Sequence, residues 1–209
     1  MRNILRIGAL SQPEIPEQLE ALIEAIFREQ FKKLSLILGQ KNISLVSAYE
    51  DKANELACIS AIEEGLNLEI GPLQIASNLD ETDAKIRSKI YRVLENQPAT
   101  TVVDQQLSES DIISLCDILI LVFDKSDLDK FSMFELIRES FFEGQQGDPA
   151  TEKLSIEINM PTLWTPDADG EVHFEYILRA PGKRDVSSEI EIPERIIQQW
   201  TNRRDTRSH

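Results

Sequence analysis

Along the chain, segments with the hydrophobic pattern of a strand alternate with segments that have the pattern of a helix. Short continuous apolar runs are typical of strands that are buried on both faces of a sheet. Residues 118–123 form such a run, and residues 3–10, 43–48 and 66–70 are further segments that we expect to be strands. Between them, apolar residues recur every three or four positions, as on one face of a helix. These helical stretches cover residues 16–34, 51–64, 81–94 and 132–142. Strands that alternate with helices form βαβ units, so the pattern predicts an α/β protein.

The expected architecture is a doubly wound, mostly parallel, Rossmann-like sheet of about five strands with helices on both faces. A short strand at 100–103 and a last parallel strand at 160–165 complete the predicted sheet. The intervening stretch 144–155 is expected to be a polar loop. Ser108 and Asp111 have the spacing of a capping pair, which predicts the start of a short helix.

The pattern changes after residue 165. Asp169-Gly170 is typical of a hairpin turn, and apolar residues then alternate with more polar ones. The alternating apolar residues are Val172, Phe174, Tyr176 and Leu178. We therefore expect an antiparallel strand at the sheet edge, followed by a final helix that begins at Pro193. The predicted organisation is a Rossmannoid domain over 1–165 and a strand and helix extension over 166–209, packed on the same domain.

The composition and net charge limit the kinds of molecule that the chain is expected to bind. The chain has 209 residues, of which 41% are hydrophobic and 28% charged, as in an ordinary globular protein. Its net charge of −15 argues against broad contact with a nucleic-acid backbone, so no nucleic-acid partner is expected. A single nucleotide remains compatible with this charge, because helix N-termini and backbone amides provide local positive potential.

Other segments and chemistries are not expected. No apolar run approaches the roughly 20 residues that span a bilayer, and no signal peptide is recognisable, so we expect a cytoplasmic protein without a membrane partner. Cys58 and Cys116 do not have the spacing of a disulfide framework or a zinc site. The two histidines, His173 and His209, offer neither a catalytic triad nor a metal site.

Three loops are candidates for ligand binding. In a doubly wound sheet, ligands bind beyond the carboxyl ends of the strands, where the strand order reverses. This rule selects the loops at 8–12, 47–52 and 124–132, each of which leads toward a helix start that favours an anion. The candidate ligand-binding residues in them are Gly8, Ser11, Ser47, Tyr49, Asp51, Lys52, Asp124, Lys125 and Ser132.

The candidate residues differ in the role expected of each. Ser11 is placed to donate to a phosphate, and Lys125 to reach an anion. Asp51 and Lys52 could contact a ribose and a phosphate, or could simply form a solvated helix N-terminus. Asp124 is expected to order its loop by accepting backbone hydrogen bonds.

The chain resembles a known superfamily over residues 3–165. Gly8-Ala9-Leu10 follows the first strand, and Ser47-Ala48-Tyr49-Glu50-Asp51-Lys52-Ala53 opens the second helix. An Asp-hydrophobic strand runs from Asp117 to Asp124, and Pro161-Thr162-Leu163-Trp164 matches the last strand. These segments resemble the SLOG superfamily of Rossmannoid nucleotide-binding domains, which is related to DNA-processing protein A and to the "lonely guy" phosphoribohydrolases.

The resemblance breaks off at positions where the superfamily has glycine or a basic residue. Lys52 replaces a glycine, Glu55 replaces a basic residue, and Phe131-Ser132-Met133 stands where Gly-Gly-Thr is expected. Glycine lets a phosphate approach the backbone with no Cβ in the way. Ser132 and Glu135 keep the Ser/Thr-x-x-Glu spacing of the phosphoribohydrolase motif, in which the glutamate is catalytic. The same spacing is that of a capping box.

Three functions follow from these observations. The first is a sensor that binds a nucleotide or nucleotide derivative, the only kind of ligand or cofactor that the sequence suggests. The second is a scaffold with a vestigial pocket, acting through its C-terminal hairpin and helix or through a homodimer on the helix at 16–34. The third is a nucleotide N-glycosidic hydrolase in which Glu135 is catalytic. We favour the sensor slightly over the scaffold, and both over catalysis.

Overall fold

The computed structural model describes residues 4–11, 15, 17–49, 51–73, 81–123, 128–143, 153–159, 175–180, 183–187, 194 and 197–198. Their strands form one eight-stranded sheet with the order β4-β3-β2-β1-β5-β6-β7-β8. The strands are β1 (Leu5–Ser11), β2 (Ile43–Ser47), β3 (Asn67–Ile70), β4 (Thr100–Val102), β5 (Ile118–Phe123), β6 (Leu154–Asn159), β7 (Glu175–Ala180) and β8 (Lys183–Ser187).

Strands β1 to β6 pair with one another in parallel. Strand β7 then pairs with β6, and β8 with β7, in antiparallel register. The predicted α/β class and the mostly parallel Rossmann-like sheet are therefore confirmed. The parallel part contains one strand more than the five or so expected from the sequence.

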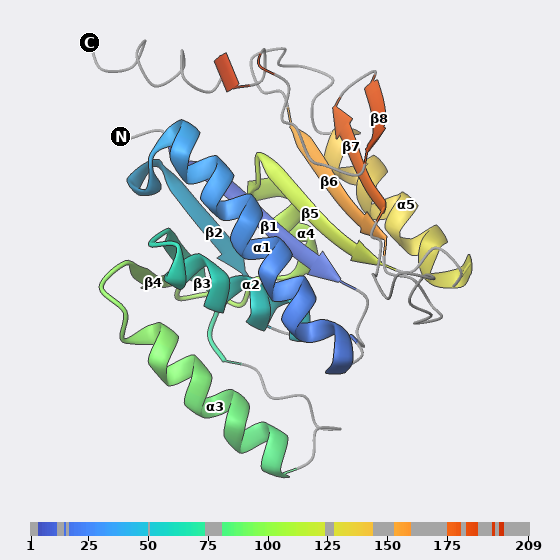
Figure 1. Cartoon of the computed structure of the whole chain (residues 1–209). Coiled ribbons are helices and arrows are strands. Elements are labelled where there is room, and N and C mark those ends of the chain that lie inside the picture. Colours follow the sequence, from blue (N-terminus) through green and yellow to red (C-terminus); the bar gives the residue numbers. More distant parts are fainter. Residues whose placement is uncertain are drawn as a thin grey trace, which may run out of the picture.

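Helices cover both faces of the sheet. They are α1 (Glu17–Leu38), α2 (Lys52–Glu63), α3 (Glu81–Glu95), α4 (Glu109–Leu115) and α5 (Leu128–Glu143), with a short 3-10 helix at Gln40–Asn42. In Figure 1, α1 and α2 lie in front of the sheet, α4 and α5 lie behind it, and α3 extends beyond β3 and β4. None of the described helices is long and apolar enough to cross a membrane.

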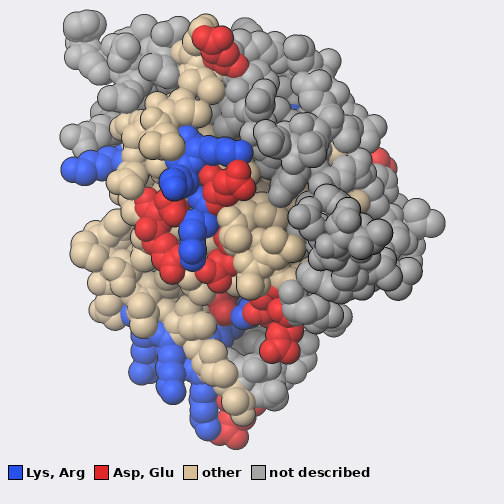
Figure 2. Space-filling model, viewed as in Figure 1, with Lys and Arg blue, Asp and Glu red and all other residues tan. Residues whose placement is uncertain are grey.

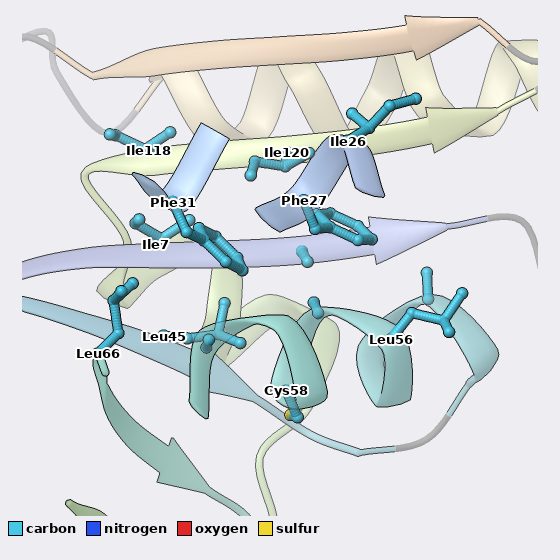
Figure 3. Packing of buried hydrophobic residues seen from close by; sticks show 14 of the residues in the cluster. Ile7, Ile26, Phe27, Phe31, Leu45, Leu56, Cys58, Leu66, Ile118 and Ile120 are labelled. Carbon is cyan, nitrogen blue, oxygen red and sulfur yellow. The ribbon is translucent and has the colours of Figure 1, made fainter. Parts of the chain in front are cut away.

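The larger core lies between the sheet and helices α1 and α2. The rings of Phe27 and Phe31 on α1 are stacked 6.0 Å apart and are fully buried. Figure 3 shows them beside Ile7 of β1, with Ile120 of β5 close by. The smaller core on the opposite face joins β5 to α5, where the rings of Phe123 and Phe134 stack at 5.3 Å. Burial on both faces explains the continuous apolar run of β5.

The last parallel strand is displaced from its predicted position. Strand β6 occupies Leu154–Asn159, so the prediction that 144–155 is a loop is wrong for its final two residues. The predicted strand at 160–165 lies outside the described residues. Strand β6 was missed because Ser155 and Glu157 make it look polar, yet both are buried, and Glu157 lies 3.9 Å from Arg138 of α5. Buried polar residues of this kind require partners from elsewhere in the chain.

Two smaller predictions can be compared with the described residues. Ser108 caps α4 in a capping box with Asp111, as expected. The predicted final helix is described only at Glu194, Ile197 and Gln198, which are helical. The amide of Gln198 donates to the carboxylate of Glu194 at 3.2 Å.

Candidate functional site

The strand order reverses between β1 and β5. The chain leaves β1 toward β2 on one side, and returns to β5 on the other. Ser11, the last residue of β1, is in register with Val122 near the end of β5. The carboxyl ends of β1, β2 and β5 therefore lie at one edge of the sheet, which is where a doubly wound fold binds ligands.

Gly8 does not lie in a loop. It is inside β1, which continues to Ser11, so the predicted loop at 8–12 starts later than expected. A Cβ on Gly8 would lie 2.5 Å from Cγ2 of Ile112 and 2.8 Å from Sγ of Cys116. The glycine therefore allows α4 to pack closely against β1, a role that needs no ligand.

Ser47 belongs to a buried hydrogen-bond network at the carboxyl end of β2. Its hydroxyl donates to Oδ1 of Asn54 at 2.9 Å and accepts from the backbone N–H of Tyr49 at 3.0 Å. The amide of Asn54 donates to the carbonyl of Ala9 at 3.2 Å and to Oδ1 of Asp51 at 2.8 Å. This network connects β1, β2 and the start of α2. Sequence reasoning did not single out Asn54, and the polar residues at buried positions of α2, Asn54 among them, are the signal that could have found it.

Tyr49 holds the loop in an unusual backbone conformation. Among the described residues, it is the non-glycine residue with a positive φ, at 57°. Left-handed backbone costs about 1–2 kcal/mol at a residue with a Cβ, and such strain is concentrated at functional sites. The Tyr49 ring is fully buried, and burial, followed by the nearby Glu55, raises the pKa of its phenol.

Arg87 and Tyr91 of α3 keep Tyr49 in place. Arg87 donates from Nη2 to the carbonyls of Tyr49 at 2.9 Å and Asp51 at 3.2 Å. Its guanidinium carbon also lies 5.2 Å from the centre of the Tyr49 ring. The ring of Tyr91 meets Tyr49 edge-on at 5.4 Å. The sequence did not single out Arg87, because its partners are 36 and 38 residues away along the chain.

Asp51 is the N-cap of α2. Its Oδ1 accepts from the backbone N–H of Asn54 at 2.7 Å, which satisfies one of the free amides at the helix start. Burial raises the pKa of this carboxyl, an effect that the bonds from Asn54 and the charge of Arg87 only partly oppose. Asp51 therefore has a structural role, which the sequence had offered as the alternative to ribose contact.

Lys52 is shared by two carboxylates. Its ammonium lies 2.9 Å from Oε1 of Glu55 and 3.2 Å from Oε2 of Glu20, so it connects α1 to α2. Burial alone would lower the pKa of Lys52, but bonding to Glu55 and then Glu20 outweighs this effect and raises it. Since Glu55 is buried, Lys52 also provides the partner that a charge largely removed from water requires.

The third predicted loop is only partly described. Asp124 and Lys125 lie outside the described residues, as does the side chain of Ser132. Helix α5 begins at Leu128, so Ser132 is inside the helix, and the prediction that it starts and caps this helix is wrong. Residues 128–131 contain neither glycine nor proline, so nothing in them prevents the helix from starting earlier. Glu135 pairs with Arg138 on the same helix at 3.3 Å.

A cavity of about 390 Å³ lies along α3, and none of the predicted site residues is in its described lining. Its described lining is Glu81, Ala84, Lys85, Ser88, Lys89 and Arg92. Figure 2 shows basic side chains gathered over α3, whereas acidic and basic side chains alternate over α1 and α2. Among the residues that the structure describes, no group of His, Cys, Asp and Glu could hold a metal ion.

The Asp51 geometry predicts how stability depends on pH. A carboxyl whose pKa is raised on folding from its usual 3.8 stabilises the fold most below that pH, and loses this contribution as pH rises through the folded pKa. Asn caps a helix about as well as Asp but does not ionise. We therefore expect Asp51→Asn to gain in melting temperature relative to wild type as pH rises from about 4 to 8. Thermal denaturation across this range checks the prediction, and a difference that shrinks with pH would contradict it.

No protein-family model, no curated protein and no solved structure matches this chain. The function is therefore argued from the residues and geometry described above.

Proposed function

We propose that this chain is a divergent SLOG-type domain that binds a nucleotide or nucleotide derivative as a sensor, without turning it over. The ligand would lie at the carboxyl edge of the sheet, against Ser11 and the loop at 47–52. The observation that carries the proposal is the strained Tyr49 backbone, held by Arg87 beside the point where the strand order reverses. Strain is retained where surrounding structure enforces it, and binding loops are typical of such places. Two buried free cysteines support a reducing, cytoplasmic setting.

A scaffold with a vestigial pocket is the second candidate, and a specific observation favours it. The side chains of Ser47, Asp51 and Lys52 all have partners within the chain. Intramolecular partners of this kind can replace a ligand that has been lost. A homodimer on α1 would belong to this candidate and stays a prediction. The described outer surface of α1 exposes Leu36 and Ile37 near its end.

Catalysis is the least supported candidate. Glu135 lies inside α5 and forms an ion pair with Arg138 of the same helix. Among the described residues, neither Glu135 nor Arg138 pairs with a residue at the carboxyl edge of the sheet. A hydrolase would release free base from a nucleoside monophosphate and would lose this activity in Glu135→Ala. We expect no release of free base from the wild-type protein or from Glu135→Ala.

A thermal-shift screen against nucleosides, nucleoside phosphates and dinucleotides tests the sensor. A ligand at about 100 times its dissociation constant adds about 2.7 kcal/mol to stability, which corresponds to a rise of about 5–11 °C for a chain of this size. Ser11→Leu should abolish the rise by blocking the end of β1, whereas Ser114→Ala on α4 should not change it. No rise with any ligand at millimolar concentration would instead favour the scaffold.

A further inference from the structure

The outer face of α3 carries positive charge in a strongly negative chain. Residues 84–94 contain four basic residues and no acidic one, whereas the whole chain has a net charge of −15. Lys85, Lys89 and Arg92 are exposed, and their i, i+4, i+7 spacing places them on one face of the helix. Since a helix rises about 1.5 Å per residue, this basic row is about 10 Å long. Figure 2 shows basic side chains gathered over α3.

The cations of this row are available to a partner. Among the described residues, neither Lys89 nor Arg92 forms an ion pair. Lys85 pairs with Glu81 of the same helix, but both side chains are strongly exposed, so a better placed carboxylate could replace Glu81 at little cost. All three cations also line the cavity of about 390 Å³ along α3. Available cations beside a concave surface favour an acidic partner.

Two apolar side chains of α3 point away from the core. Tyr91 and Leu94 are buried on the inner side of the helix, but Ile86 is 50% exposed and Val93 is 61% exposed. Ile86 and Val93 are seven residues apart, so they lie on one face beside the basic row, and neither lines the cavity. In Figure 1, α3 lies at the edge of the described structure, beyond β3 and β4. A partner that packs on this face would remove apolar surface from water.

We propose that this outer face of α3 is a docking surface for an acidic amphipathic helix of a partner protein. The surface consists of Lys85, Ile86, Lys89, Arg92 and Val93. A partner helix can present carboxylates and apolar side chains at the same spacing of about 10 Å, so it would meet the basic row and the apolar pair together. The proposal goes beyond the nucleotide site and does not depend on it.

The charge of α3 distinguishes this occupant from two others. A symmetric dimer would place the same patch on both sides of its interface, so the cations of the two copies would repel one another. A nucleic acid would meet a chain with a net charge of −15 around one short basic row. An acidic helix avoids both costs, because it is small and complementary in sign.

Fluorescence anisotropy with a labelled synthetic helix tests the proposal. The probe is a peptide of about 20 residues that is built from glutamate and leucine at helical spacing. Wild type is expected to bind it with a Kd of about 10 μM or less, and at least tenfold more tightly than peptides with lysine in place of glutamate or serine in place of leucine. Lys89→Glu combined with Arg92→Glu should weaken binding at least tenfold, and so should Ile86→Ser combined with Val93→Ser.

Matched variants on other helices separate docking on α3 from general effects of charge and apolar surface. Lys32→Glu combined with Lys33→Glu makes the same change of charge on α1. Leu36→Ser combined with Leu136→Ser removes two side chains that are 79% and 65% exposed, on α1 and α5. Both double variants should leave the Kd unchanged within twofold. Circular dichroism checks that every variant is folded, and glutamine replaces glutamate at 89 and 92 if the charge reversal prevents folding.

Four results would overturn the proposal. The first is a Kd for the acidic peptide above about 1 mM, and the second is binding that survives both double variants of α3. The third is tighter binding of an oligothymidylate than of the peptide, which would indicate a nucleic-acid partner. The fourth is self-association in sedimentation that Lys89→Glu with Arg92→Glu abolishes, which would indicate a second copy of this chain. None of these results bears on the nucleotide site.

Discussion

Replacing Arg179 with alanine is expected to destabilise the protein by about 3–5 kcal/mol, because it would leave a buried carboxylate without its closest cation. Glu157 on β6 is 1% exposed. Its Oε1 pairs with Arg179 of β7, lies 3.9 Å from Arg138 of α5, and accepts from the hydroxyl of Ser155 at 3.3 Å. Its Oε2 has no hydrogen bond among the described residues, so half of the carboxylate already lacks a hydrogen-bond partner. Urea denaturation of both proteins measures the difference.

Two variants show whether charge burial is the cause. Glu157→Gln combined with Arg179→Met removes both charges, and should recover most of the stability lost in Arg179→Ala. Arg28→Ala breaks an exposed pair with Glu24 and Glu63, and should cost no more than about 1 kcal/mol. A loss below about 1 kcal/mol in Arg179→Ala would mean that Glu157 is not held as described.

Replacing Gly8 is expected to give the second large effect. A Cβ at this position would meet Ile112 at 2.5 Å and Cys116 at 2.8 Å, both of them buried side chains of the α4 region. Overpacking of this kind costs about 1–3 kcal/mol for Gly8→Ala, and Gly8→Val should cost more. Urea denaturation measures these losses.

A double-mutant cycle identifies the contact responsible. If the clash with Ile112 is the cause, Gly8→Ala should cost at least about 1 kcal/mol less in an Ile112→Ala background than in wild type. Equal costs in the two backgrounds would show that Ile112 is not the side chain that requires glycine, which would leave Cys116 as the contact responsible. A Gly8→Ala protein as stable as wild type would contradict the packing account altogether.

Sequence periodicity was enough to predict the sheet and its helices because each buried strand and helix has its own local pattern. The strand at 118–123 is buried on both faces, and its apolar run has no other simple explanation. Strand β6 does not follow such a pattern. Its Glu157 is buried because arginines at 138 and 179 neutralise it, and no local rule connects residues so far apart.

The candidate site was predicted as a location and not as a set of contacts. The rule for doubly wound sheets selected the ends of β1 and β2, which lie at one edge of the sheet; that a ligand binds there stays a prediction. It did not predict that Ser47 and Asp51 would be bonded to Asn54, or that Tyr49 would be held by Arg87. Those contacts depend on how α2 and α3 pack against the loop, which the hydrophobic pattern alone does not specify. The start of α5 was missed because Ser132-x-x-Glu135 fits a capping box whether or not a helix begins there.

Hydrogen–deuterium exchange with and without 5 mM adenosine tests most directly whether the carboxyl edge of the sheet is a binding site. The account predicts slower exchange at the amides of residues 8–11 and 47–55, with little change in α4. Unchanged exchange in both segments, or protection confined to α3 along its cavity, would contradict a nucleoside site at this edge.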